Sequence, residues 1–158
     1  MTNPHDGNQQ NQVLSESSNW VAETTDWVST NTDLAIHGAM SEANSNYVFT
    51  VSNNSANSIT GAQLMHILPP ELNVSWLCLN ATAGAICPST SGTGDMVLSL
   101  DLPAGASMDF EVQWTNPTVN QKVVVTVTVP DGMNDIQIQN NVFRGYLKDV
   151  IFDAGGFE

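Results

Sequence analysis

The chain has 158 residues, of which 41% are hydrophobic, enough for one domain with its own core. Sixteen Asp and Glu face only three Lys and Arg, and a net charge of −13 argues against nucleic acid and anionic lipid as partners. No apolar run approaches the roughly 20 residues of a membrane helix, so we expect no membrane insertion.

Residues 1–32 are expected to form a polar N-terminal arm. Its first dozen residues are almost all polar, and such a composition cannot build a packed core. They include neither a basic region nor an apolar stretch, so they are not a signal peptide. The arm does carry two apolar pairs, Trp20-Val21 and Trp27-Val28. We favour an arm that folds back on its own domain; the alternative is a segment that docks on a neighbouring subunit.

Residues 33–158 show the two-residue alternation of β-strands with one buried face. The clearest runs cover 47–52, 96–102, 108–114 and 123–129, and shorter candidates cover 34–40, 63–68, 74–79 and 142–152. Asn, Pro and Gly separate them, as in Pro69-Pro70 and Pro130-Asp131-Gly132. About seven to eight short strands predict an all-β, immunoglobulin-like antiparallel β-sandwich.

The two cysteines, Cys78 and Cys87, lie nine positions apart, a spacing suited to a disulfide across a turn. Two free thiols or half of a zinc site are the alternatives, but no histidine lies near this pair in the sequence. We favour the disulfide. Because disulfides persist outside the cytosol, we then expect an extracellular or cell-surface protein whose leader has been removed.

Several short motifs occur in an order that resembles a known family. They are Asp33-Leu34-Ala35-Ile36, YVFTVSNNS at 47–55, LPPEL at 68–72, Trp76-Leu77-Cys78, Ile86-Cys87-Pro88, SGTG at 91–94, LPAGAS at 102–107, the strand 125–130, Asp135 and Asn140-Asn141. The set is similar to the immunoglobulin-like repeats known as domain of unknown function eleven, found in bacterial and archaeal surface proteins. The likeness covers about residues 33–142 and implies an Ig-like sandwich, export and no catalytic activity.

Candidate sites for chemistry are few. His5, His37 and His66 show no metal-binding spacing, and no nucleophile elbow or phosphate-binding loop is present. Asp109 and Glu111 share one face of a strand, which we interpret as a solvated edge rather than a catalytic pair.

The weak candidate for a metal is calcium. Its ligands would be Asp131, Asn134, Asp135 and Asn140, because carboxylate and amide oxygens suit this ion. The spacing does not match an EF-hand, so we favour a loop stabilised by Asn and Asp side chains, and we expect no cofactor. An isopeptide bond through Lys122 or Lys148 is a more remote alternative.

The leading functional hypothesis is a non-enzymatic extracellular structural module of a bacterial surface protein: a spacer, an adhesin segment or a filament subunit. In the filament form, the arm would donate a strand to the next copy, so the partner would be the protein itself or another surface protein. The alternative is a carbohydrate-binding module, in which Trp20, Trp27, Trp76 and Trp114 could stack on a glycan.

Overall fold

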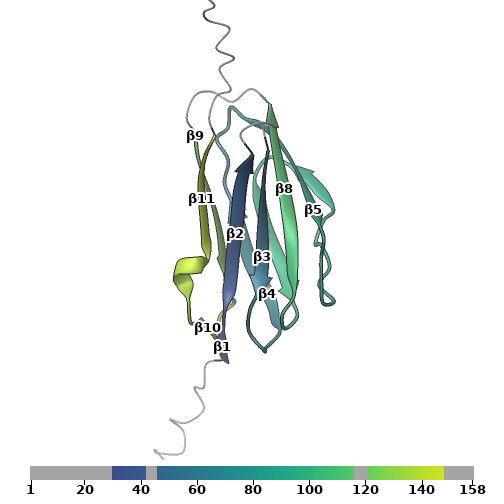
Figure 1. Cartoon of the computed structure of the whole chain (residues 1–158), viewed down its shortest axis with the longest axis vertical. Coiled ribbons are helices and arrows are strands. Elements are labelled where there is room, and N and C mark those ends of the chain that lie inside the picture. Colours follow the sequence, from purple (N-terminus) through teal and green to yellow (C-terminus); the bar gives the residue numbers. More distant parts are fainter. Residues whose placement is uncertain (1–29, 42–45, 116–120, 148–158) are drawn as a thin grey trace, which may run out of the picture.

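The computed structural model describes residues 30–41, 46–115 and 121–147. Over these residues the chain is an immunoglobulin-like β-sandwich with two antiparallel sheets packed face to face (Figure 1). No α-helix occurs in this part, and none of its helices is long and apolar enough to cross a membrane. The all-β fold predicted from the alternation is therefore confirmed.

Eight strands of six or more residues make up the two sheets. They are β2 (Leu34–Ser41), β3 (Asn46–Asn53), β4 (Ile59–His66), β5 (Asn73–Leu79), β7 (Met96–Leu102), β8 (Ser107–Thr115), β9 (Gln121–Thr128) and β11 (Val142–Leu147). Each matches one expected run. The described residues add three strands of three residues and a 3₁₀ turn: β1 (Thr30–Thr32), β6 (Ser91–Thr93), β10 (Met133–Asp135) and η2 (Ile138–Asn140).

The strand order places the first and the last long strand, β2 and β11, on opposite sheets. The five-stranded sheet has the order β2-β3-β8-β5-β6 and the four-stranded sheet the order β11-β9-β4-β7. β2 and β11 close one side of the sandwich, where Gly38 lies so close to the ring of Phe143 that a Cβ would clash at 2.5 Å. A glycine is needed at this position because the two sheets approach each other there.

The core follows the predicted alternation. In β3, Tyr47, Phe49 and Val51 are buried, whereas Val48 between them is 39% exposed. Aliphatic and aromatic side chains of both sheets meet in this way, and Phe49 stacks on Phe110 with ring centroids 5.2 Å apart. Burial of these side chains between two sheets supplies the main stabilising term of the fold.

One feature differs from the prediction. Thr30–Thr32, at the end of the arm that we expected to be able to form a strand, is strand β1 and pairs in parallel with β10, so not every pairing is antiparallel. Because all three residues of β1 are polar, their sequence has no alternation of apolar and polar side chains. The strand can be recognised only from its pairing with β10. The apolar pairs Trp20-Val21 and Trp27-Val28, and the predicted strand beyond Leu147, lie outside the described residues.

Candidate functional site

The two cysteines form a disulfide. Cys78, on β5, is bonded to Cys87 with a Cα–Cα distance of 5.9 Å, and the chain has no free cysteine. The prediction is confirmed, and the alternatives of free thiols or a zinc half-site are excluded. The bond closes a loop that leaves the end of β5 and returns as β6.

Hydrogen bonds hold this disulfide loop against the neighbouring strand β8. The amide of Thr82 donates to the carbonyl oxygen of Ser107 at 2.9 Å, and the amide of Ser107 donates to Thr82 Oγ1 at 3.0 Å. Asn80 adopts a φ of +52° and donates from Nδ2 to Asp109 Oδ2 at 2.9 Å. The loop is fixed at both ends, and it exposes 80% of the Ile86 side chain.

The calcium candidates fall into two groups. Asp131 stands apart, whereas Asn134, Asp135 and Asn140 belong to a cluster of hydrogen-bonded polar residues around Asp135, which we call the polar knot. Asp131 is exposed in the turn before β10. Asp135 is 8% exposed, and its carboxylate accepts from the amide of Leu34 at 3.1 Å, the amide of Gln137 at 2.9 Å and Asn141 Nδ2 at 2.9 Å. The Asp135 carboxylate therefore already has three donors.

The other residues of the knot also bond within the protein. Asn140 Nδ2 donates to Asp33 Oδ1 at 2.9 Å, and Asn134 Nδ2 donates to Asn31 Oδ1 at 3.2 Å. The amide oxygens of Asn140 and Asn141 have no partner. Nowhere in the described residues, however, do three or more His, Cys, Asp and Glu gather in a way that could hold a metal. The arrangement is that of a loop stabilised by Asn and Asp, and it ties β1, β2 and β10 together.

Asp109 and Glu111 do not lie at an edge, contrary to the interpretation from the sequence. Their strand β8 is the middle strand of the five-stranded sheet, which alternation within one strand cannot reveal. Thr50 Oγ1 donates to Asp109 Oδ1 at 2.6 Å. Donation from Gln113 and then Asn46 lowers the pKa of Glu111. Both acids thus accept hydrogen bonds in a polar ladder across the sheet.

One histidine is deeply buried. His66, on β4, is fully buried, and its Nε2 forms a hydrogen bond with the hydroxyl of Tyr47 on the opposite sheet. Burial lowers the pKa of His66 to about 4 and raises the pKa of Tyr47 above its usual value. The imidazole is therefore neutral near pH 7, and the pair links the two sheets rather than facing a ligand.

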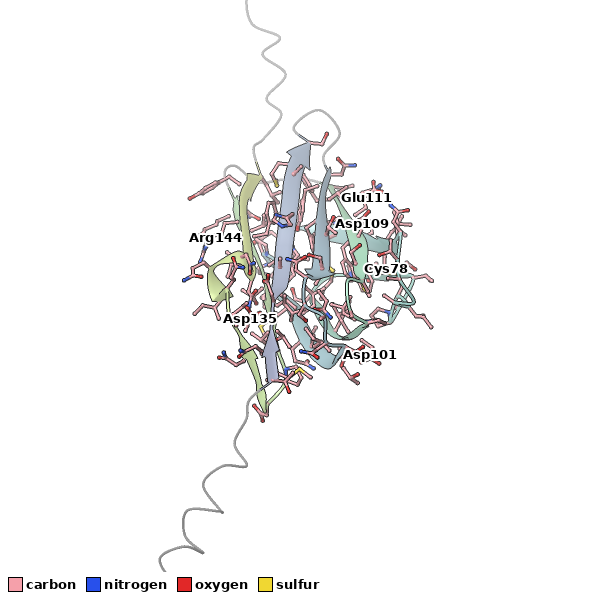
Figure 2. All side chains as sticks on the ribbon, turned by 60° about the horizontal axis from the view of Figure 1, so that its bottom comes forward. Cys78, Asp101, Asp109, Glu111, Asp135 and Arg144 are labelled. Atoms are coloured by element: carbon pink, nitrogen blue, oxygen red, sulfur yellow. A yellow bond between two sulfur atoms is a disulfide. The ribbon has the colours of Figure 1, made fainter. Side chains whose placement is uncertain are left out.

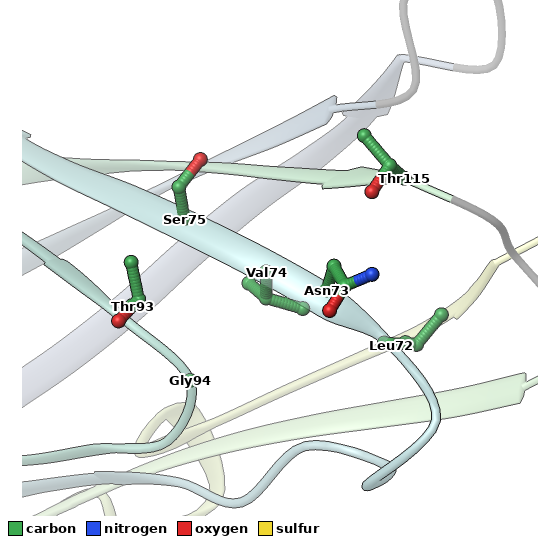
Figure 3. Close-up of a pocket in the computed structure, with 7 residues that line it drawn as sticks. All are labelled: Leu72, Asn73, Val74, Ser75, Thr93, Gly94 and Thr115. Atoms are coloured by element: carbon green, nitrogen blue, oxygen red, sulfur yellow. The ribbon is translucent and has the colours of Figure 1, made fainter.

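Two surface hollows formed by the described residues contain no catalytic set. One of about 470 Å³ lies between β5, β6 and the end of β8, lined by Leu72, Asn73, Val74, Ser75, Thr93, Gly94 and Thr115 (Figure 3). None of these residues is ionisable near neutral pH. Another, of about 410 Å³, lies between the disulfide loop and β7, and Asp101 is the one acid among its lining residues. Asp101 already accepts from the amide of Gly61 at 2.9 Å.

The described tryptophans do not form a glycan platform. Trp76 and Trp114 are 6% and 7% exposed and belong to the core. Trp76 packs edge-on against Phe110, with ring centroids 6.4 Å apart. Of the four proposed stacking residues, only Trp20 and Trp27 in the arm are left, and these lie outside the described residues.

An exposed apolar face was missed in the sequence. Met65 on β4 and Val97 on β7 are directly paired and 48% and 61% exposed, and Ile67 just after β4 is 55% exposed. They lie on the outer side of the four-stranded sheet. The sequence did indicate this face, because these apolar residues stand at outward-facing positions of their strands, where polar side chains are usual.

Comparison of the chain with models of protein families and with curated proteins found no match.

Proposed function

We propose that the chain is a non-enzymatic, extracellular structural module of a bacterial surface protein, serving as a spacer, an adhesin segment or a filament subunit. The disulfide between Cys78 and Cys87 carries this proposal, because such bonds persist in oxidising compartments and are rare in the cytosol. The likeness of residues 33–142 to immunoglobulin-like repeats of surface proteins supports the same role.

The distribution of polar groups is also that of a structural module. The buried Asp33 and Asp135 accept hydrogen bonds from Asn and Gln side chains and from backbone amides. In an active site, by contrast, polar groups converge on a cavity and carry perturbed pKa values. The strongly shifted groups here, His66 and Tyr47, bond to each other inside the core.

The test is the location and redox state of the protein in its native cells. Antibodies against the folded chain should label the cell exterior in immunogold microscopy, and alkylation with mass spectrometry should find Cys78 and Cys87 joined. A cytosolic protein with two alkylated thiols would overturn the proposal. Hydrolysis of an ester, glycoside or peptide substrate by the purified chain would overturn its non-enzymatic part.

A further inference from the structure

The basic residues that the structure describes lie on one face of this acidic molecule. The chain has three basic residues, Arg144, Lys122 and Lys148, for sixteen acids. Lys122 on β9 and Arg144 on β11 both lie on the outer side of the four-stranded sheet, where Arg144 pairs with Val124 and Lys122 with Tyr146. Figure 2 shows Arg144 at one flank of the sandwich and Asp109 and Glu111 at the other.

The same face presents apolar side chains. Met65 and Val97 share one level of the sheet, Ile67 follows two residues later in the chain, and Tyr146 is 62% exposed beside Lys122. Alternate residues of a strand are about 7 Å apart, so these side chains occupy successive levels of one surface. A partner for this basic apolar face, defined by Met65, Ile67, Val97, Tyr146, Lys122 and Arg144, needs apolar side chains together with carboxylates.

The N-terminal arm has this chemistry. Residues 1–29 contain four acids, Asp6, Glu16, Glu23 and Asp26, and no Lys or Arg. Their apolar residues come in pairs seven positions apart: Val13-Leu14, Trp20-Val21 and Trp27-Val28. Glu23 and Asp26 lie between the two tryptophan pairs, so carboxylates and large apolar side chains alternate along the segment.

We propose that the basic apolar face binds residues 13–28 of a second copy of this chain. This inference rests on the proposed structural function and specifies its partner. Carboxylates of the arm contact Lys122 and Arg144, and the two Trp-Val pairs cover the apolar levels. Burial of aromatic side chains supplies most of the affinity, and the charges set the orientation.

The reach of the arm favours a second copy over its own. Gly38, on β2, lies against Phe143 on β11. The residue before Phe143, Val142, pairs with Thr126 on β9, and Thr126 pairs with Met65 on β4. The residue before Gly38 therefore lies at about the same height along the strands as Met65. Seven strand residues therefore separate Thr30 from the level of Met65, or about 23 Å. Trp27 precedes Thr30 by three residues, which span at most about 11 Å. The Trp27 backbone therefore stops short of this level in its own copy, whereas Trp20, ten residues before Thr30, can span the distance, so both Trp-Val pairs can cover the face together only in a second copy.

The position of the face also suits an assembly that grows from end to end. β1, at the start of the described chain, lies at one end of the long axis of the sandwich, whereas β11 runs toward the other (Figure 1). An arm that continues beyond β1 can meet the far end of a neighbour. Because the arm and the face are different surfaces, the contact is heterologous and can repeat from copy to copy.

Sedimentation velocity of the full chain over a range of concentrations tests the proposal. We expect association, and Met65→Glu with Val97→Glu should weaken it at least about tenfold, because two carboxylates then meet an acidic arm. Trp20→Ala with Trp27→Ala should weaken it as much. The matched control is Leu77→Glu with Leu79→Glu on the five-stranded sheet, where side chains that are 39% and 40% exposed gain the same two charges and association should not change.

A charge exchange distinguishes the contact from a folding defect. Lys122→Glu with Arg144→Glu should abolish association, as should Glu16→Lys, Glu23→Lys and Asp26→Lys in the arm, and the five changes together should restore it. Equal association of all these chains would overturn the proposal, as would a monomeric wild-type chain at every concentration. A monomer that is exported and disulfide-bonded would overturn this contact and leave the proposed module standing.

Discussion

The hydrogen bond between Tyr47 and His66 is a polar contact inside an otherwise apolar core. His66 is fully buried, and the two residues come from opposite sheets. Charging a buried imidazole is costly, and burial therefore lowers its pKa from 6.5 to about 4. The pair fixes the relative position of β3 and β4, because neither polar group has water as an alternative partner.

This shift makes stability depend on pH. The unfolded chain binds a proton at His66 as the pH falls below about 6.5, whereas the folded chain resists until about 4. The folded state should therefore lose about 3 kcal/mol from this residue between pH 7 and pH 4. His66→Gln keeps a polar partner for Tyr47 and removes the titration.

Urea unfolding of both proteins across this range isolates the effect, because the carboxylates common to both cancel in the difference. Parallel pH profiles for wild type and His66→Gln would contradict the prediction. The sequence indicated that His66 is structural, since it stands alone in a strand, but alternation within one strand could not name Tyr47 as its partner.

At the scale of elements, the polar knot around Asp135 holds the short strands in place. β1 and β10 have three residues each, too few to be stable alone. Asp135 bonds to the amide of Leu34, at the start of β2, and to Gln137 and Asn141 on either side of η2. The Asp135 carboxylate thus links β2, the first long strand, to the segment that precedes β11, the last long strand.

Asp135→Ala should lower the free energy of unfolding by about 3 kcal/mol, because three donors, two of them in buried hydrogen bonds, lose their acceptor. Asp131→Ala, in the exposed turn before β10, is the matched control and should change it by less than about 0.5 kcal/mol. Chemical denaturation measures both. Similar losses for the two variants would mean that the knot stabilises nothing.

Calcium offers a second readout of the same knot. Because the Asp135 carboxylate already accepts three hydrogen bonds, millimolar calcium should raise the unfolding midpoint of the wild type no more than magnesium does. A calcium-specific rise that Asp135→Ala removes would show that the knot binds the ion.

The elements themselves were predicted to different degrees, for physical reasons. The eight long strands were found because one face of each is buried, which imposes alternation on the sequence. β1, β6 and β10 carry mostly small or polar residues whose conformation depends on a partner far away in the chain, as Thr30 depends on Met133. For the same reason, we placed Asp109 and Glu111 at an edge of the sheet from the sequence. The sequence of one strand does not show which strands lie on either side of it.

At the scale of the whole molecule, repulsion between like charges destabilises the folded state. The whole chain has a net charge of −13, and its described residues hold eight Asp and Glu against two Lys and Arg, so like charges repel within the sandwich. The two described basic residues, Lys122 and Arg144, lie on one face, so most of the surface has no positive charge to offset its acids. The overall charge was evident from composition, but its segregation required the register of β9 with β11.

Salt should therefore have opposite effects on folding and on assembly. Between about 10 mM and 1 M salt the Debye length falls from about 30 Å to about 3 Å, which screens repulsion inside each monomer and attraction between copies. The thermal midpoint of the Lys122→Glu, Arg144→Glu chain, which should not associate, is expected to rise steadily with NaCl. Each reversal lowers the net charge by two, so the two together take it from −13 to −17 and should steepen the rise of the thermal midpoint.

The wild-type chain should show both responses at once. Its association, followed by sedimentation, should weaken as NaCl increases from low to moderate concentration, while its monomer becomes more resistant to heat. A midpoint that is insensitive to salt in the reversed chain would mean that self-repulsion is negligible despite the charge. Association that strengthens over the same range would mean that apolar contacts alone hold the copies together, and that Lys122 and Arg144 do not orient the arm.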